Sequence, residues 1–180
     1  MKITVMTGSP HKQGTSFLLA DNFIRGAEEA GNEVFRFDCA FKTVHPCIGC
    51  EACGKGTSAC AFPDDMRELA PHLLEADLIA FITPLYYFDM SAQIKTVIDR
   101  FHGYNIQMRG RKCDTVLLVT ADLPYKWVMK GVTSHYEAML HYLGWNDRGR
   151  VLALDCGDLE AMMKTDFPEK AYEFGKSLTD

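Results

Sequence analysis

The stretch TGSPHKQGTS, residues 7–16, follows an apolar strand pattern at 2–7 and leads into a helical pattern at 15–30. A chain that leaves a strand, turns tightly and enters a helix aims backbone N–H groups and the positive end of the helix dipole at one point. Gly8 and Gly14 let the backbone approach a ligand closely, and the neighbouring hydroxyl groups add donors. We interpret residues 8–16 as a phosphate-binding loop.

A capped helix after a turn is the alternative interpretation, because Ser and Thr cap helices well without any ligand. The stretch lacks the Gly-Lys-Ser/Thr ending of a Walker A loop and the G-x-G-x-x-G pattern of a dinucleotide loop. Both absences argue against an ATPase and against a dinucleotide at this loop. The terminal phosphate of a mononucleotide therefore fits best.

Length and composition favour one globular domain over residues 1–180, of which 47% are hydrophobic. The net charge of −5 argues against a nucleic-acid partner held by phosphate contacts. Because the sequence shows neither a run of 18 apolar residues nor a signal segment, we expect a cytoplasmic protein with no membrane span. Its seven cysteines would then be mostly reduced.

Further apolar strand patterns alternate with helical patterns along the rest of the chain, at 33–37, 77–82, 115–120 and 151–154. This alternation predicts an α/β fold, a flavodoxin-like three-layer sandwich with a five-stranded parallel sheet of order 2-1-3-4-5 and helices on both faces. Ligands of such sheets bind beyond the carboxyl ends of the strands. The loops that decide the site are therefore 8–16, 83–90 and 121–131.

Helix signals fill the intervals between the strands. Asp64 and Asp65 can begin one helix, in which Pro71 predicts a kink or a restart. Ser91 can cap the next helix, and a last one is expected to begin near Pro168.

Three consecutive aromatic residues, Tyr86, Tyr87 and Phe88, lie in the expected second loop. A run of three fits neither the period of a strand nor that of a helix. These side chains could form the wall of a site for a flat conjugated ring, with the backbone of 84–87 bonded to the polar edge of that ring. The alternative is a hydrophobic loop at a contact between subunits, and the two interpretations are compatible.

Four segments together resemble the flavodoxin-fold NAD(P)H-dependent FMN reductases. They are residues 8–16, Thr83-Pro84-Leu85-Tyr86, the stretch 90–95 and Ile98-Asp99-Arg100. The resemblance runs from residue 1 to about 155. It implies FMN, with the phosphate in loop 8–16, the isoalloxazine ring against 84–88, and loop 121–131 closing the far side.

Carried over position by position, the resemblance implies a set of cofactor-binding residues. For the phosphate they are Ser9, His11, Gly14, Thr15 and Ser16; for the ring they are Pro84, Leu85, Tyr86, Tyr87 and Phe88, with Ala121 and Asp122 from the third loop. His11 stands where the family often has Arg, and Thr15 stands where Asn is common. Trp127 either faces the flavin or packs against the protein.

The activity implied is hydride transfer from NADPH or NADH to FMN, with the electrons then passed to a small acceptor such as a quinone or free flavin. The cofactor carries this chemistry, so no side chain is assigned as catalytic. A non-enzymatic flavin-binding redox module is an alternative. Members of the family are often dimers or larger, so a homodimer or a higher oligomer is expected.

The cysteine-rich segment at about 45–62 contains Cys47, Cys50, Cys53 and Cys60. Thiolates at this short spacing can converge on an iron–sulfur cluster. The motif resembles that of iron–sulfur flavoproteins, which implies a 4Fe-4S cluster in a protein acting mainly in electron transfer. Zinc, a labile disulfide or a loop that binds nothing are the alternatives, and we assign no metal as the first hypothesis. The remaining cysteines, Cys39, Cys113 and Cys156, are expected in the core.

Overall fold

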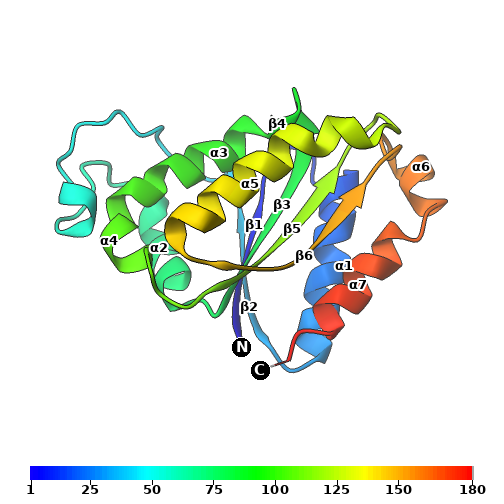
Figure 1. Ribbon diagram of the computed structural model, residues 1–180, viewed down its shortest axis with the longest axis horizontal. Helices are drawn as coiled ribbons and strands as arrows, with labels where there is room; N and C mark the ends of the chain where they lie inside the picture. The colour runs from blue at the N-terminus through cyan, green and yellow to red at the C-terminus, as the bar shows by residue number, and fades with distance from the viewer. Residues whose placement is uncertain (180) are drawn as a thin grey trace.

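The computed structural model describes residues 1–179 and shows a central sheet between two layers of helices (Figure 1). The strands of this sheet are β1 (Lys2–Thr7), β2 (Glu33–Asp38), β3 (Leu78–Tyr86), β4 (Asp89–Met90), β5 (Asp114–Thr120) and β6 (Asn146–Ala153). The α-helices are α1 (Thr15–Glu29), α2 (Met66–Glu75), α3 (Ala92–Asp99), α4 (Asn105–Met108), α5 (Lys130–Leu143), α6 (Leu159–Met163) and α7 (Phe167–Lys176). The 3-10 helices are η1 (Cys39–Phe41), η2 (Gly54–Gly56), η3 (Arg100–Tyr104) and η4 (Lys126–Met129).

The parallel strands lie in the order β2-β1-β3-β5-β6, which is the predicted flavodoxin-like order. The sheet has one strand more than predicted, because the two-residue β4 pairs antiparallel with the end of β3. The expected loop 83–90 is therefore largely a hairpin. β3 does not end at Ile82 as predicted but continues to Tyr86. Its last two residues pair with Asp89 and Met90.

Side chains along the inner strands alternate between two cores, one on each face of the sheet. Leu78, Ala80 and Ile82 of β3 pack in the core beneath α1 and α7, whereas Ile79 and Phe81 pack in the core beneath α2, α3 and α5. A strand that is buried on both faces is apolar throughout, which is why β1, β3 and β5 were visible in the sequence.

The edge strand β6 is longer than predicted, beginning at Asn146 instead of Val151. Its first half is polar and exposed, since an edge strand is covered less completely than an inner one. The helix α2 continues through Pro71 as one helix, so the alternative of a restart at Pro71 is wrong. Leu69 and Leu73, both fully buried, hold the two halves of α2 against the core.

The segment between η1 and α2 contains the cysteine-rich residues and projects beyond the helices at the left of Figure 1. No helix within residues 1–179 is both long and apolar enough to cross a membrane.

Candidate functional site

The loop between β1 and α1 is held in place by close packing at Gly8. A Cβ atom built on Gly8 would lie 2.6 Å from Ser91 Oγ and 2.9 Å from both Thr83 Oγ1 and Ile94 Cγ2. In the structure Ser91 Oγ instead donates a hydrogen bond of 2.6 Å to the Gly8 carbonyl oxygen. Ser91 thus precedes α3 as expected, but its hydroxyl group fixes the loop rather than capping its own helix.

The loop leads into α1, and the first N–H groups of this helix make no hydrogen bond within the helix. The first intrahelical bond runs from Leu18 N to Gly14 O, so the amides of residues 15–17 precede the intrahelical series. The Ser9 hydroxyl accepts a bond of 3.1 Å from His11 N, and Gly14 N donates to His11 O at 3.0 Å. These contacts pre-shape a concave turn at the positive end of a helix of 15 residues, which suits an anion.

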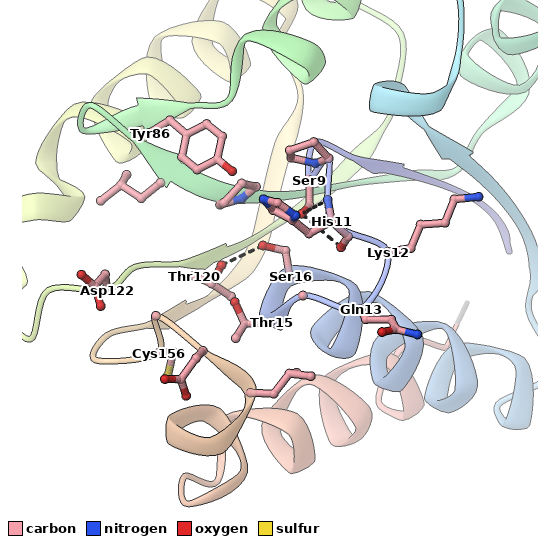
Figure 2. Close-up of a pocket in the computed structure, with 17 residues that line it drawn as sticks. Ser9, His11, Lys12, Gln13, Thr15, Ser16, Tyr86, Thr120, Asp122 and Cys156 are labelled. Carbon is pink, nitrogen blue, oxygen red and sulfur yellow. Dashed lines mark hydrogen bonds between the residues drawn. The ribbon is translucent and has the colours of Figure 1, made fainter.

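This turn forms one wall of a cavity of about 860 Å³, a size typical of small-molecule sites (Figure 2). The cavity is lined by Ser9, Pro10, His11, Lys12, Gln13, Gly14, Thr15, Ser16, Pro84, Leu85, Tyr86, Thr120, Asp122, Cys156, Gly157, Asp158 and Leu159. The structure therefore brings together all five residues expected at the phosphate, three of the five expected at the ring, and Asp122.

Tyr87, Phe88 and Ala121 do not line this cavity. Tyr87 and Phe88 form the two-residue turn between β3 and β4 with φ angles of 45° and 68°, and this turn directs them away from the cavity. Tyr87 is 99% exposed, and the Phe88 ring packs 5.3 Å from that of Trp127. Ala121 is buried, with its backbone paired to Ala153 and Cys156.

Besides the three loops expected from the sequence, a fourth segment lines the cavity, residues 156–159, which the sequence analysis did not predict. It follows β6, and Cys156 N donates a bond of 2.8 Å to Ala121 O, which joins it to the third loop. Gly157 lies directly against Asp122, since a Cβ atom on it would lie 2.1 Å from Asp122 Oδ1. The rule that ligands lie beyond the carboxyl ends of strands applies equally to the fifth parallel strand and could have indicated this wall.

The ionisable side chains that line the cavity differ in charge and in exposure. Burial raises the pKa of the Cys156 thiol, so this group is neutral at physiological pH. This thiol donates a hydrogen bond of 3.1 Å to Leu154 O. Asp122 and Asp158 are exposed carboxylates, and Lys12 extends away from the cavity toward Phe41 (Figure 2).

The four clustered cysteines line a second, much smaller cavity of about 20 Å³, together with Phe62, Arg100 and His102. All seven cysteines of the chain are free thiols. Among residues 1–179, no group of three or more His, Cys, Asp or Glu is arranged to hold a metal ion. The thiols share a cavity and suit a thiophilic group chemically, but their positions are not those of ligands around one ion. Cys39, Cys113 and Cys156 are buried, as expected.

Arg100 anchors this cysteine segment to the domain. Its guanidinium, 3% exposed, lies 2.5 Å from the Asp64 carboxylate and donates to His45 O at 2.8 Å and to Cys60 Sγ at 3.2 Å. Burial by itself would raise the pKa of Asp64, but the Arg100 hydrogen bonds and the His45 amide outweigh it, so the pKa is lowered. The pair is therefore ionised at neutral pH.

Comparison with known proteins identifies the family. Residues 1–153 match the family described as NADPH-dependent FMN reductase. This chain belongs to that family. The FMN reductase resemblance seen in the sequence is thereby confirmed.

Relatives of this FMN reductase family member include curated iron–sulfur flavoproteins. One from Archaeoglobus fulgidus is 34% identical over 114 residues, covering 62% of this chain and 51% of the relative. Another, from Methanocaldococcus jannaschii, is 36% identical over 113 residues, covering 62% of this chain and 58% of the relative. The chain spans about half the length of these curated relatives.

Solved structures share the fold at lower sequence identity. An NAD(P)H:quinone oxidoreductase from Methanothermobacter marburgensis superposes with a TM-score of 0.71 at 20% identity, covering 99% of this chain and 96% of that one. An azoreductase from Bacillus anthracis superposes with a TM-score of 0.75 at 16% identity, covering 99% of this chain and all of that one. At these identities the likeness concerns the fold.

Proposed function

We propose that this protein is an NAD(P)H-dependent oxidoreductase that uses FMN bound in the cavity of about 860 Å³. The observation that carries the proposal is the meeting of the glycine- and hydroxyl-rich loop 9–16 with Pro84–Tyr86 at one cavity. One wall offers backbone and hydroxyl donors at a helix N-terminus, as a phosphate requires. The other offers apolar and aromatic surface, as a flavin ring requires.

The residues of the chain have separate tasks in this proposal. Ser9, His11, Gly14, Thr15 and Ser16 surround the phosphate, with Ser9 and Ser16 also holding the loop itself through hydrogen bonds. Pro84, Leu85 and Tyr86 would hold the ring, and Thr120 and Asp122 line the same cavity beside them. When bound, FMN supplies the hydride and electron chemistry, and the protein positions it and shields it from water.

The test is a titration of the purified protein with FMN and, in parallel, with riboflavin, followed by absorption and fluorescence. We expect FMN to bind with a changed spectrum and quenched fluorescence, and riboflavin to bind at least tenfold more weakly because it lacks the phosphate. Oxidation of NADPH or NADH by the FMN-loaded protein with a quinone then distinguishes an enzyme from a flavin-binding module. Spectra of free flavin at every ratio would contradict the proposal.

A second candidate function is that of an iron–sulfur flavoprotein. It is favoured by the gathering of Cys47, Cys50, Cys53 and Cys60 at one cavity and by the names of the relatives. The four thiols would hold a 4Fe-4S cluster after a rearrangement of the segment 45–62, since the present cavity of about 20 Å³ is too small for one. Iron and acid-labile sulfide in protein purified without oxygen would support this candidate, and their absence would exclude it.

A homodimer or larger oligomer is part of the proposal. Exposed aromatic side chains gather near the cavity on the hairpin turn and the third loop, namely Tyr87, Phe88, Tyr125 and Trp127. A cluster of this kind is typical of a surface that is covered by another protein chain. Sedimentation velocity measures the mass directly, and a monomer at micromolar concentration would contradict this part.

A further inference from the structure

The cavity has opposite charge character at its two ends. Loop 9–16 offers backbone N–H groups and the positive end of α1. The facing walls, Thr120 with Asp122 and residues 156–159, contribute the carboxylates of Asp122 and Asp158. In Figure 2, Asp122 and Cys156 lie on the side of the cavity away from Lys12.

The two carboxylates are brought to one place by specific backbone contacts. The bond from Cys156 N to Ala121 O ties the third loop to the residues after β6. The absence of a side chain at Gly157 then allows Asp122 to pack directly against it. The Asp158 carboxylate is fixed in turn, because its Oδ1 accepts a bond of 2.8 Å from Ala161 N at the start of α6.

Basic groups do not neutralise this end of the cavity. Among the described residues that line the whole cavity, Lys12 is the one lysine, His11 is the one histidine and no arginine occurs. Both basic residues belong to loop 9–16, and the Lys12 ammonium lies 4.6 Å from the centre of the Phe41 ring. Lys126 and Lys130 follow in the third loop and α5 without lining the cavity. Asp158 also borders a neighbouring hollow that contains Asp155 and Glu160, where Lys164 is already paired with Glu160 at 2.7 Å.

We propose that Asp122 and Asp158 select the electron acceptor by charge, favouring uncharged or cationic aromatic compounds over anionic ones. This inference rests on the proposed function, because it concerns the compound that reaches the FMN ring. An anion approaching within several ångströms of two carboxylates is disfavoured by Coulomb repulsion, even when water screens it. A neutral quinone meets no such barrier. In the reaction the quinone gains two electrons and two protons to become the hydroquinone, and reduced FMN is oxidised.

The experiment isolates the step with the acceptor. FMN-loaded protein is reduced without oxygen by one equivalent of dithionite and mixed rapidly with 1,4-naphthoquinone or with its 2-sulfonate. The readout is the ratio of the two second-order rate constants for flavin reoxidation, anionic over neutral. This ratio is compared between the variant D122N/D158N and the wild type. The two quinones differ in reduction potential, but that difference affects the ratio equally in both proteins. Asn at 158 keeps a side chain that caps α6.

The control variant E28Q/E169Q removes the same number of charges from exposed positions on α1 and α7 that do not line the cavity. We expect the ratio to rise about threefold to tenfold in D122N/D158N and to stay unchanged in the control. Added NaCl, from roughly 10 to roughly 300 mM, should raise the ratio of the wild type toward that of the variant.

Three outcomes would overturn the inference. One is an equal ratio in wild type and D122N/D158N, and another is an equal rise in the control, which would indicate net charge alone. The third is a protein that retains no FMN before mixing. That result contradicts the proposed function itself and is seen in the starting spectrum, separately from any rate.

Discussion

The hydroxyl groups of Ser16 and Thr120 lie 2.7 Å apart, although 104 residues separate them in the chain. Both residues are buried, at 1% and 4% exposure. Their hydrogen bond joins the first turn of α1 to the carboxyl end of β5. It joins the expected phosphate loop to the residue just before the third loop, so the two sides of the cavity are in direct contact.

The first prediction concerns this bond. Ser16→Ala and Thr120→Val should each lower the free energy of unfolding by about 1–2 kcal/mol. The reason is that each substitution removes one hydroxyl group and leaves the other buried without its hydrogen-bond partner. The double variant should cost clearly less than the sum of the two, since it leaves no group unpaired. Urea unfolding of the four proteins measures this, and strict additivity would show that the hydroxyl groups are not coupled.

The second prediction concerns the close approach at Gly8. Gly8→Ala should lower the free energy of unfolding by about 1–3 kcal/mol, because the new methyl group meets Ser91, Thr83 and Ile94 at less than contact distance. Gly103→Ala is the matched control, since its nearest neighbour lies 3.9 Å away in ordinary contact. Thermal or urea unfolding compares the two. A Gly8→Ala protein as stable as the control would mean that the loop is not tightly packed.

The third prediction separates Tyr86 from its neighbour Tyr87. Tyr87→Asn should raise the free energy of unfolding by about 0.5–1 kcal/mol, because Asn adopts positive φ more readily than Tyr and the Tyr87 side chain is 99% exposed. It should leave the Kd for FMN unchanged. Tyr86→Ala should weaken FMN binding about fivefold or more, through the loss of an aromatic contact.

Fluorescence titration with FMN distinguishes the two tyrosine variants directly. Weaker binding in Tyr87→Asn would indicate that the hairpin turn folds over the flavin when it binds. That outcome would restore the sequence-based expectation that the whole aromatic run contacts the ring.

The fourth prediction concerns the buried pair of Asp64 and Arg100. Asp64→Asn should lower the free energy of unfolding by about 3–5 kcal/mol at pH 7, because it leaves a guanidinium of 3% exposure without its counter-charge. Asp99→Asn, which breaks the exposed pair with Lys95, should change it by less than about 1 kcal/mol.

The same pair has a defined pH dependence. The pKa of Asp64 is lower in the folded protein than its ordinary value, so the ionised pair contributes its full stability above about pH 5. This contribution is lost as the pH falls through the folded pKa, where the carboxylate takes up a proton. The difference in free energy of unfolding between wild type and Asp64→Asn should therefore be constant from about pH 5 to 8 and should decrease as the pH falls below about 4. A difference that does not depend on pH would show that the pair is not ionised.

Sequence patterns predicted the inner strands of the sheet correctly, because a strand that is buried on both faces consists almost wholly of apolar residues. Residues 78–82 and 115–119 are almost wholly apolar, and both lie in inner strands with side chains in the two cores. Only the second half of the edge strand β6 was predicted, since residues Asn146–Arg150, which are exposed or half-buried, include no apolar side chain. The hairpin after β3 was missed because its two central residues are aromatic instead of the Asn and Gly that usually mark such a turn.

By itself the sequence located the inner strands, the helices between them and the tight turn between β1 and α1, because local periodicity and turn chemistry depend on neighbouring residues. Only the tertiary structure decided which aromatic residues reach the cavity, that Cys156–Leu159 form a wall of it, and that Arg100 holds Cys60 and Asp64. These contacts join residues that lie tens of positions apart. Their geometry depends on how strands end at a common edge and how loops pack there, which no local pattern specifies.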